Sequence, residues 1–61
     1  MEKIIVELKE IMEQRGYSPE TASKFIGCSG RQVERWLKGE SNPTFVYQQL
    51  IKKGIKRMKR L

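Results

Sequence analysis

Residues 18–39 read SPETASKFIGCSGRQVERWLKG, and this stretch decides the fold. It begins with a serine followed by Pro19, a pair typical of a helix start, because the hydroxyl accepts from free amides and proline fits the first helical position. Gly27 ends that helix after about two turns. Ser29, followed three residues later by glutamine, has the spacing of a capping box and predicts a second helix that ends before Gly39. The stretch therefore predicts two short helices joined by a tight turn that contains glycine.

Helices are also expected on both sides of this pair. Apolar residues at helical spacing predict a helix over about 2–15, which Gly16 ends. A further helix is expected from near Thr44, with Gly54 placed to interrupt it. No repeat or second domain is visible, so we expect one all-α domain over residues 1–61 with four or five short helices. The expected core comprises Ile4, Ile5, Leu8, Ile11, Met12, Ala22, Phe25, Ile26, Val33, Trp36, Leu37, Phe45, Val46, Leu50, Ile51, Ile55 and Met58.

The net charge of +6 is concentrated at the C-terminal end of the chain. Residues 1–43 carry seven bases and seven acids, whereas residues 44–61 carry no acid. The six bases of this segment, which form a basic tail over about 52–61, are Lys52, Lys53, Lys56, Arg57, Lys59 and Arg60. Such a segment predicts a polyanionic partner, and both nucleic acids and membrane surfaces qualify.

Composition argues against several classes of protein. No apolar run approaches the roughly 18 residues of a membrane span, and the acidic start of the chain lacks the features of a signal peptide. The single Cys28 cannot close an intramolecular disulfide, and without histidine a zinc site lacks ligands. We therefore expect a cytoplasmic protein with no cofactor, no metal, no small-molecule substrate and no enzymatic activity. Cys28 is expected to act as a small hydrophobe rather than as a redox sensor.

The two paired helices, over about 18–38, form a helix-turn-helix. Such a pair suits double-stranded DNA, because the major groove admits one α-helix while the preceding helix braces it across the backbone. The second helix, over about 29–38, has Val33 and Trp36 on its apolar face and leaves its basic residues for a ligand. Trp36 is expected to be a core residue rather than a platform for stacking on a base.

This stretch resembles the lambda-repressor/Cro-like (XRE-type) family of DNA-binding domains over about 18–43. The resemblance rests on a glycine turn followed by serine, and on an aliphatic residue, a tryptophan, a glycine and a proline at the family's distances. The matching positions are Gly27, Ser29, Val33, Arg35-Trp36, Gly39 and Pro43. The resemblance implies that the second helix reads base edges, where arginine is the commonest partner of guanine. The residues it assigns to base reading are Gly30, Arg31, Gln32 and Arg35, and those it assigns to phosphates are Lys24, Ser29, Lys38, Ser41 and Asn42.

The expected function is that of a sequence-specific regulator of the small phage or prophage repressor or Cro kind, acting on double-stranded DNA in the nucleoid. Because one such domain reads only a few base pairs, a homodimer on a two-fold site is expected. The basic tail is expected to add phosphate contacts that residues 1–43 lack, through Lys52, Lys53, Lys56 and Arg57 above all.

Three alternatives remain open. If the register is shifted to use Ala22, the stretch resembles MerR- or excisionase-type winged domains, although no strand-rich wing is visible. An excisionase-like protein would have an architectural or recombination role. The helices could instead dock a protein partner, as an antitoxin or anti-repressor does. The tail, with Ile51, Ile55 and Met58 on one face, could also lie on anionic lipid as an amphipathic helix.

Overall fold

The computed structural model describes residues 2–60, of which 78% are helical and none lies in a strand. The helices are α1 (Lys3–Arg15), α2 (Pro19–Ile26), α3 (Gly30–Lys38) and α4 (Phe45–Arg60). The all-α class predicted from the sequence is confirmed, and the first three helices begin and end close to their predicted positions.

Local capping explains where α2 and α3 begin. The Ser18 hydroxyl accepts a hydrogen bond of 3.2 Å from the Thr21 amide, and the Ser29 hydroxyl accepts one of 3.2 Å from the Gln32 amide. Each bond satisfies an amide that has no partner inside its own helix. Gly27 ends α2 with φ of 93°, a left-handed conformation that glycine adopts without a steric penalty. The predicted helix-turn-helix is therefore built from local signals.

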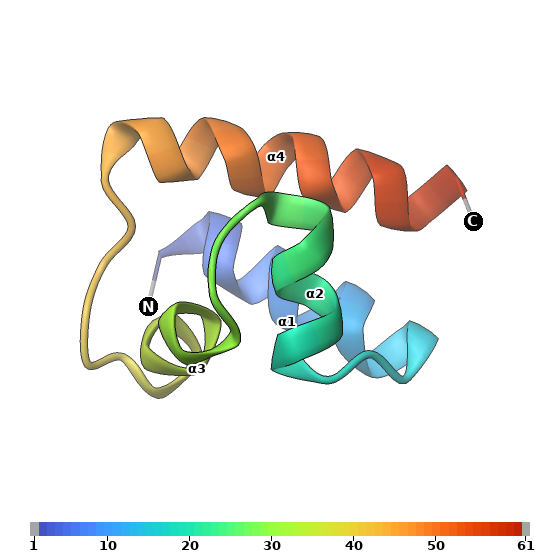
Figure 1. The fold of residues 1–61 in the computed structure, drawn as a ribbon, viewed down its shortest axis with the longest axis horizontal. Helices are drawn as coiled ribbons and strands as arrows, with labels where there is room; N and C mark the ends of the chain where they lie inside the picture. Colours follow the sequence, from blue (N-terminus) through green and yellow to red (C-terminus); the bar gives the residue numbers. More distant parts are fainter. Residues whose placement is uncertain (1, 61) are drawn as a thin grey trace.

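The helices are arranged around one core, with α4 and α3 at opposite edges of the molecule and α2 running between them (Figure 1). α2 packs against both α3 and α4, and α1 packs against α4 and α3. The described chain measures 28 × 20 × 19 Å along its principal axes. The buried core comprises Ile5, Leu8, Ile11, Met12, Ala22, Ile26, Val33, Trp36, Ile51, Ile55 and Met58.

Gly54 does not interrupt α4, so the expectation of a break at this residue is wrong. A Cβ atom at Gly54 would lie 2.8 Å from Cγ1 of Ile26 and 3.3 Å from the carbonyl oxygen of Phe25. The glycine therefore lets α4 cross the last turn of α2 at very short range. Glycine inside a helix costs about 1 kcal/mol relative to alanine, and close packing of two helices offsets that cost here.

Replacing Gly54 with valine is expected to lower the free energy of unfolding by about 1–3 kcal/mol, the usual cost of overpacking a filled core. The new side chain would collide with Ile26, whereas the better helix propensity of valine recovers only a few tenths of a kcal/mol, roughly. Urea unfolding followed by circular dichroism measures the change. Lys53→Val adds the same side chain at an exposed position of α4 and is expected to cost less than about 0.5 kcal/mol. Equal costs for the two variants would contradict the close crossing.

At its start, α4 presents different residues to the core from those predicted. Phe45 and Val46, predicted to be core residues, are 73% and 67% exposed. α4 instead directs Tyr47 and Ile51 inward, and the Tyr47 ring meets Trp36 edge-on at a centroid distance of 5.3 Å. In a helix with 3.6 residues per turn, Tyr47 and Ile51 lie on one face, and the two residues before Tyr47 lie on other faces. Phe45 and Val46 therefore point to solvent. The other predicted core residues that are only partly buried pack against the core, namely Ile4, Phe25, Leu37 and Leu50.

Candidate nucleic-acid interface

The solvent face of α3 carries the arginines expected to read bases. Arg31, Arg35 and Lys38 are exposed and line a shallow groove together with Glu34 and Glu40. No hydrogen bond or ion pair to another described residue holds either guanidinium group. With three bases and two acids, this groove carries a small net positive charge. It therefore suits contacts with base edges better than non-specific attraction to the phosphate backbone.

The opposite face of α3 is anchored in the core. Val33 is fully buried and Trp36 is 1% exposed. The prediction that Trp36 is a core residue is thus confirmed, and its ring is not available to stack on a base. This anchoring fixes the rotation of α3 about its axis, and it is the reason that Arg31 and Arg35 point outward together.

Gly30 and Ser29 are held at the junction of α2 and α3. A Cβ atom at Gly30 would lie 3.0 Å from Cα of Glu20, so this glycine lets the first turns of α2 and α3 approach each other. The predicted contact of Gly30 with DNA remains a prediction. The exposed hydroxyl of Ser29 already accepts from the Gln32 amide, which leaves its proton free to be donated to a phosphate. The half-buried Gln32 side chain does not return a bond to Ser29 among the described residues.

The other residues expected to hold phosphates are spread over the surface. Lys24 is exposed on α2, one turn beyond Glu20, and Asn42 is exposed in the segment between α3 and α4. Ser41 differs, because its hydroxyl oxygen is buried and has no hydrogen-bond partner in the described chain. In this conformation Ser41 does not present its hydroxyl to a ligand.

The bases of α4 form a surface of their own. Lys53, Lys56, Arg57 and Arg60 are exposed at spacings of three and four residues and lie together on the outer side of the helix; we call these four residues the basic ridge. Nη1 of Arg57 also donates to the Phe25 carbonyl at 3.5 Å, at the C-terminal end of α2. Lys52 and Lys59 lie on the side of α4 that faces α1, where they border, together with Lys56 of the ridge, a groove that also contains Lys3 and Glu7 of α1.

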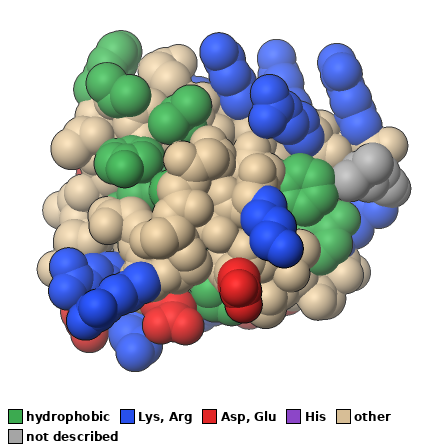
Figure 2. Space-filling model, in the orientation of Figure 1, with side chains coloured by type: hydrophobic (Ala, Val, Ile, Leu, Met, Phe, Trp, Pro, Cys, Tyr) green, Lys and Arg blue, Asp and Glu red, His purple; other side chains and the backbone are tan. Residues whose placement is uncertain are grey.

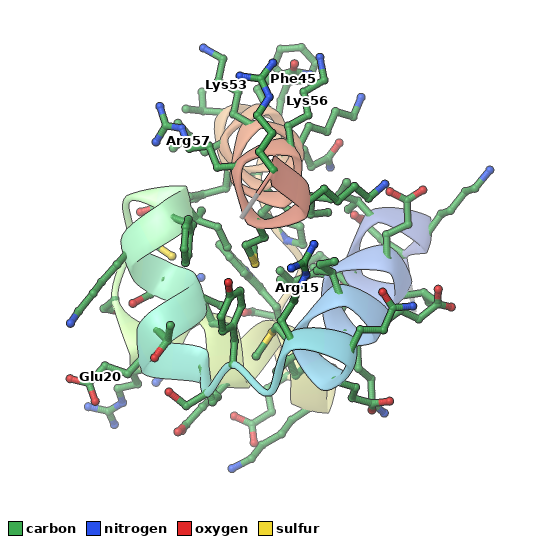
Figure 3. The ribbon with its side chains drawn as sticks, turned by 90° about the vertical axis from the view of Figure 1, so that its right-hand side faces the viewer. Arg15, Glu20, Phe45, Lys53, Lys56 and Arg57 are labelled. Carbon is green, nitrogen blue, oxygen red and sulfur yellow. The ribbon has the colours of Figure 1, made fainter. Side chains whose placement is uncertain are left out.

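The basic ridge and the bases of α3 lie at opposite edges of the molecule. Figure 2 shows Lys and Arg side chains gathered over α4 and over the region of α3, with a further basic side chain on the surface between the two groups. In Figure 3, Lys53, Lys56 and Arg57 stand at the top of the molecule, and Glu20 at the start of α2 points away at the other end. The structure therefore does not bring the predicted phosphate contacts of the tail together with the predicted base-reading residues.

Two contacts between helices could not be predicted from the local sequence. Arg15 at the end of α1 donates from Nη2 to the Lys59 carbonyl at 3.1 Å, which ties α1 to the last turn of α4. The approach of Gly30 to Glu20 joins residues on different helices. Both depend on tertiary packing, which neither periodicity nor capping patterns reveal.

Other chemistry is not indicated by the described residues. Within residues 2–60, no three His, Cys, Asp or Glu side chains are grouped so that they could hold a metal ion, and no helix is long and apolar enough to cross a membrane. Burial raises the pKa of the Cys28 thiol above its usual value, which lowers the fraction of reactive thiolate at neutral pH. The half-buried Cys28 packs against the core, in keeping with a small hydrophobe.

Comparison with known proteins agrees with this geometry. A family model described as Helix-turn-helix (HTH_3) matches residues 8–47, which extend from the middle of α1 into the start of α4. Searches of curated proteins and of solved structures found no significant match. The matched family is a DNA-binding domain family whose members are typically not enzymes. Because the match covers most of the chain and includes both helices of the motif, the protein belongs to the lambda-repressor/XRE-type helix-turn-helix family.

Proposed function

We propose that this protein is a sequence-specific transcription regulator of the small phage or prophage repressor or Cro kind, which inserts α3 into the major groove of double-stranded DNA. The observation that carries the proposal is the pair formed by Arg31 and Arg35. Both are exposed on the face of α3 opposite the buried Trp36, and neither is engaged by another described residue. Unengaged guanidinium groups on a rigid helix suit bidentate contacts with guanine.

The remaining predicted contacts would set the register of α3 on the duplex. Ser29, at the start of α3, has a hydroxyl proton to donate, and Lys38 extends from its last turn. Lys24 and Asn42 flank the motif on either side. Such contacts position a protein on DNA and carry no sequence information by themselves.

We expect two copies to act together, because α3 has nine residues and spans only about 14 Å of groove. Two copies of a chain with a net charge of +6 would meet with least repulsion at an uncharged surface. Residues 41–51 contain no charged residue, and their exposed Phe45 and Val46 provide apolar area at the start of α4. Figure 2 shows hydrophobic side chains and no Lys or Arg at this corner, where α4 begins. Two copies per site, detected by sedimentation of the complex, are expected to fall to one in a Val46→Lys variant.

Selection of bound sequences from a pool of random duplexes tests the proposed function directly. We expect a palindromic consensus with half-sites separated by about one helical turn, or a multiple of it, as two-fold pairs of such domains require. Failure to enrich any sequence would contradict a regulator that reads DNA. It would favour a module whose helices dock a protein. An excisionase-type role finds no support in the fold, because its wing requires strands and residues 2–60 contain none.

A further inference from the structure

The basic ridge is a concentrated cationic surface whose charges form no ion pair with a described residue, although Arg57 also donates to the Phe25 carbonyl. Its four residues project from one side of α4, and the described part of α4 contains no acid to neutralise them. From Lys53 to Arg60 the helix rises about 10 Å, and duplex DNA carries about six phosphate charges over that length of its axis. The ridge therefore matches a polyanion of the charge density of a duplex.

A lipid surface is a weaker candidate for this ridge. The apolar residues of the same part of α4 face inward, since Ile51 and Met58 are fully buried and Ile55 is 4% exposed. A helix that lies in a membrane interface buries its apolar face among the acyl chains, and α4 has already used that face in the protein core. Apart from Phe45 and Val46 at the start of the helix, α4 offers a membrane charge alone.

Position separates the ridge from any duplex that α3 binds. α3 and α4 lie at opposite edges across the 20 Å dimension of the molecule (Figures 1 and 3). The major groove is only about 8.5 Å deep, so a straight duplex that accommodates α3 leaves the outer side of α4 outside the groove. Lys53, Lys56 and Arg57 then point away from that duplex.

From this geometry we infer that the basic ridge is a second duplex-binding surface, so that one domain can hold two DNA segments at once. α3 holds one segment by base contacts, and the ridge holds the phosphates of another without regard to sequence. The inference rests on the proposed function of α3 and adds to it, because it assigns the excess charge of the tail to a different stretch of DNA. A protein with this property would join distant sites or compact the DNA to which it is bound.

A capture assay with two duplexes tests the inference. One random-sequence duplex is immobilised on beads, the protein is added, and retention of a second, fluorescent duplex is measured over a range of salt concentrations. We expect the natural protein to retain the second duplex at low salt. A Lys53→Gln, Lys56→Gln variant is expected to lose this capture about tenfold and to show a log–log salt slope shallower by about one to two units, because each phosphate contact adds about 0.9.

The matched control removes the same charge from α1. Lys9 is an exposed base of α1 outside both the ridge and α3, and Lys9→Glu, which lowers the net charge by two as the ridge variant does, is expected to leave capture unchanged. Equal loss in both variants would mean that capture follows net charge alone, which overturns a localised second surface. Undiminished capture by the ridge variant would show that the two duplexes are joined in another way, for example through two copies bound by α3, and would also overturn it.

Two further measurements separate this inference from the proposed function. If Arg31→Ala and Arg35→Ala leave preference for the selected site unchanged while the ridge variant still loses capture, the proposed role of α3 fails and the second surface stands. If the natural protein binds phosphatidylserine vesicles at the same salt concentration and captures no second duplex, the ridge serves lipid and the inference is wrong.

Discussion

Replacing Trp36 with alanine is expected to lower the free energy of unfolding by about 3–5 kcal/mol, the range for removal of a fully buried large aromatic side chain. Trp36 is 1% exposed and joins α3 to the rest of the core, with Tyr47 of α4 packed edge-on against its ring. Domains of this size have little stability to spare, so a loss of that order leaves the variant largely unfolded at 37 °C. Thermal and urea unfolding followed by circular dichroism measure the effect.

Two comparisons make this expectation specific. Phe45→Ala removes an aromatic side chain that is 73% exposed, and at concentrations where the chain is monomeric it is expected to change stability by less than about 0.5 kcal/mol. Trp36→Phe retains most of the aromatic volume and is expected to cost less than Trp36→Ala. If Trp36→Ala melts like the natural protein and only DNA binding is lost, the ring faces the ligand and the packing described for α3 is wrong.

Local sequence signals were sufficient to predict the helix-turn-helix. Ser18 and Ser29 cap the two helices through bonds that span three residues, and Gly27 provides the left-handed turn between them. Each of these features depends only on residues that are close in the sequence. The same is true of the apolar faces that place Val33 and Trp36 in the core.

Features that depend on contacts between helices were predicted poorly. Gly54 resembles a helix breaker in the sequence, but it serves as the point where α4 crosses Ile26 of α2. Phe45 and Val46 resemble core residues, but the ring of Trp36 is met by Tyr47 instead, and the rotation of α4 follows from that contact. In both cases the composition of α4 was correctly interpreted as helical, while its orientation was fixed by partners that lie far away in the chain.

The candidate site shows the same division. The sequence places Arg31 and Arg35 on one helix face, and the structure leaves both exposed and without a bond to any other residue of 2–60. The sequence could not predict on which side of the molecule the bases of α4 lie, because this depends on how α4 packs across α2. Net charge indicated a polyanionic partner, and only the fold separates the edge occupied by Lys53 and Lys56 from the edge occupied by α3.

The second large effect is expected in DNA recognition. Arg31→Ala and Arg35→Ala are each expected to weaken binding to the selected site by about 1–3 kcal/mol, the usual contribution of a bidentate contact with a base, and to change binding to random duplexes little. Binding is measured on both duplexes at one fixed salt concentration. Lys9→Ala removes an exposed base of α1 and serves as the control, with little change expected on either duplex.

Arg31→Lys and Arg35→Lys separate recognition from charge. Lysine retains the positive charge but lacks the planar pair of donors that matches guanine, so these variants are expected to lose preference for the selected site while keeping the salt dependence of the natural protein. The groove that contains Arg31 and Arg35 also contains Glu34 and Glu40, so its small net charge contributes little attraction to phosphates in general. Loss of affinity for selected and random duplexes in equal measure would therefore mean that the arginines act as simple cations. In that case α3 would not be the element that reads the sequence.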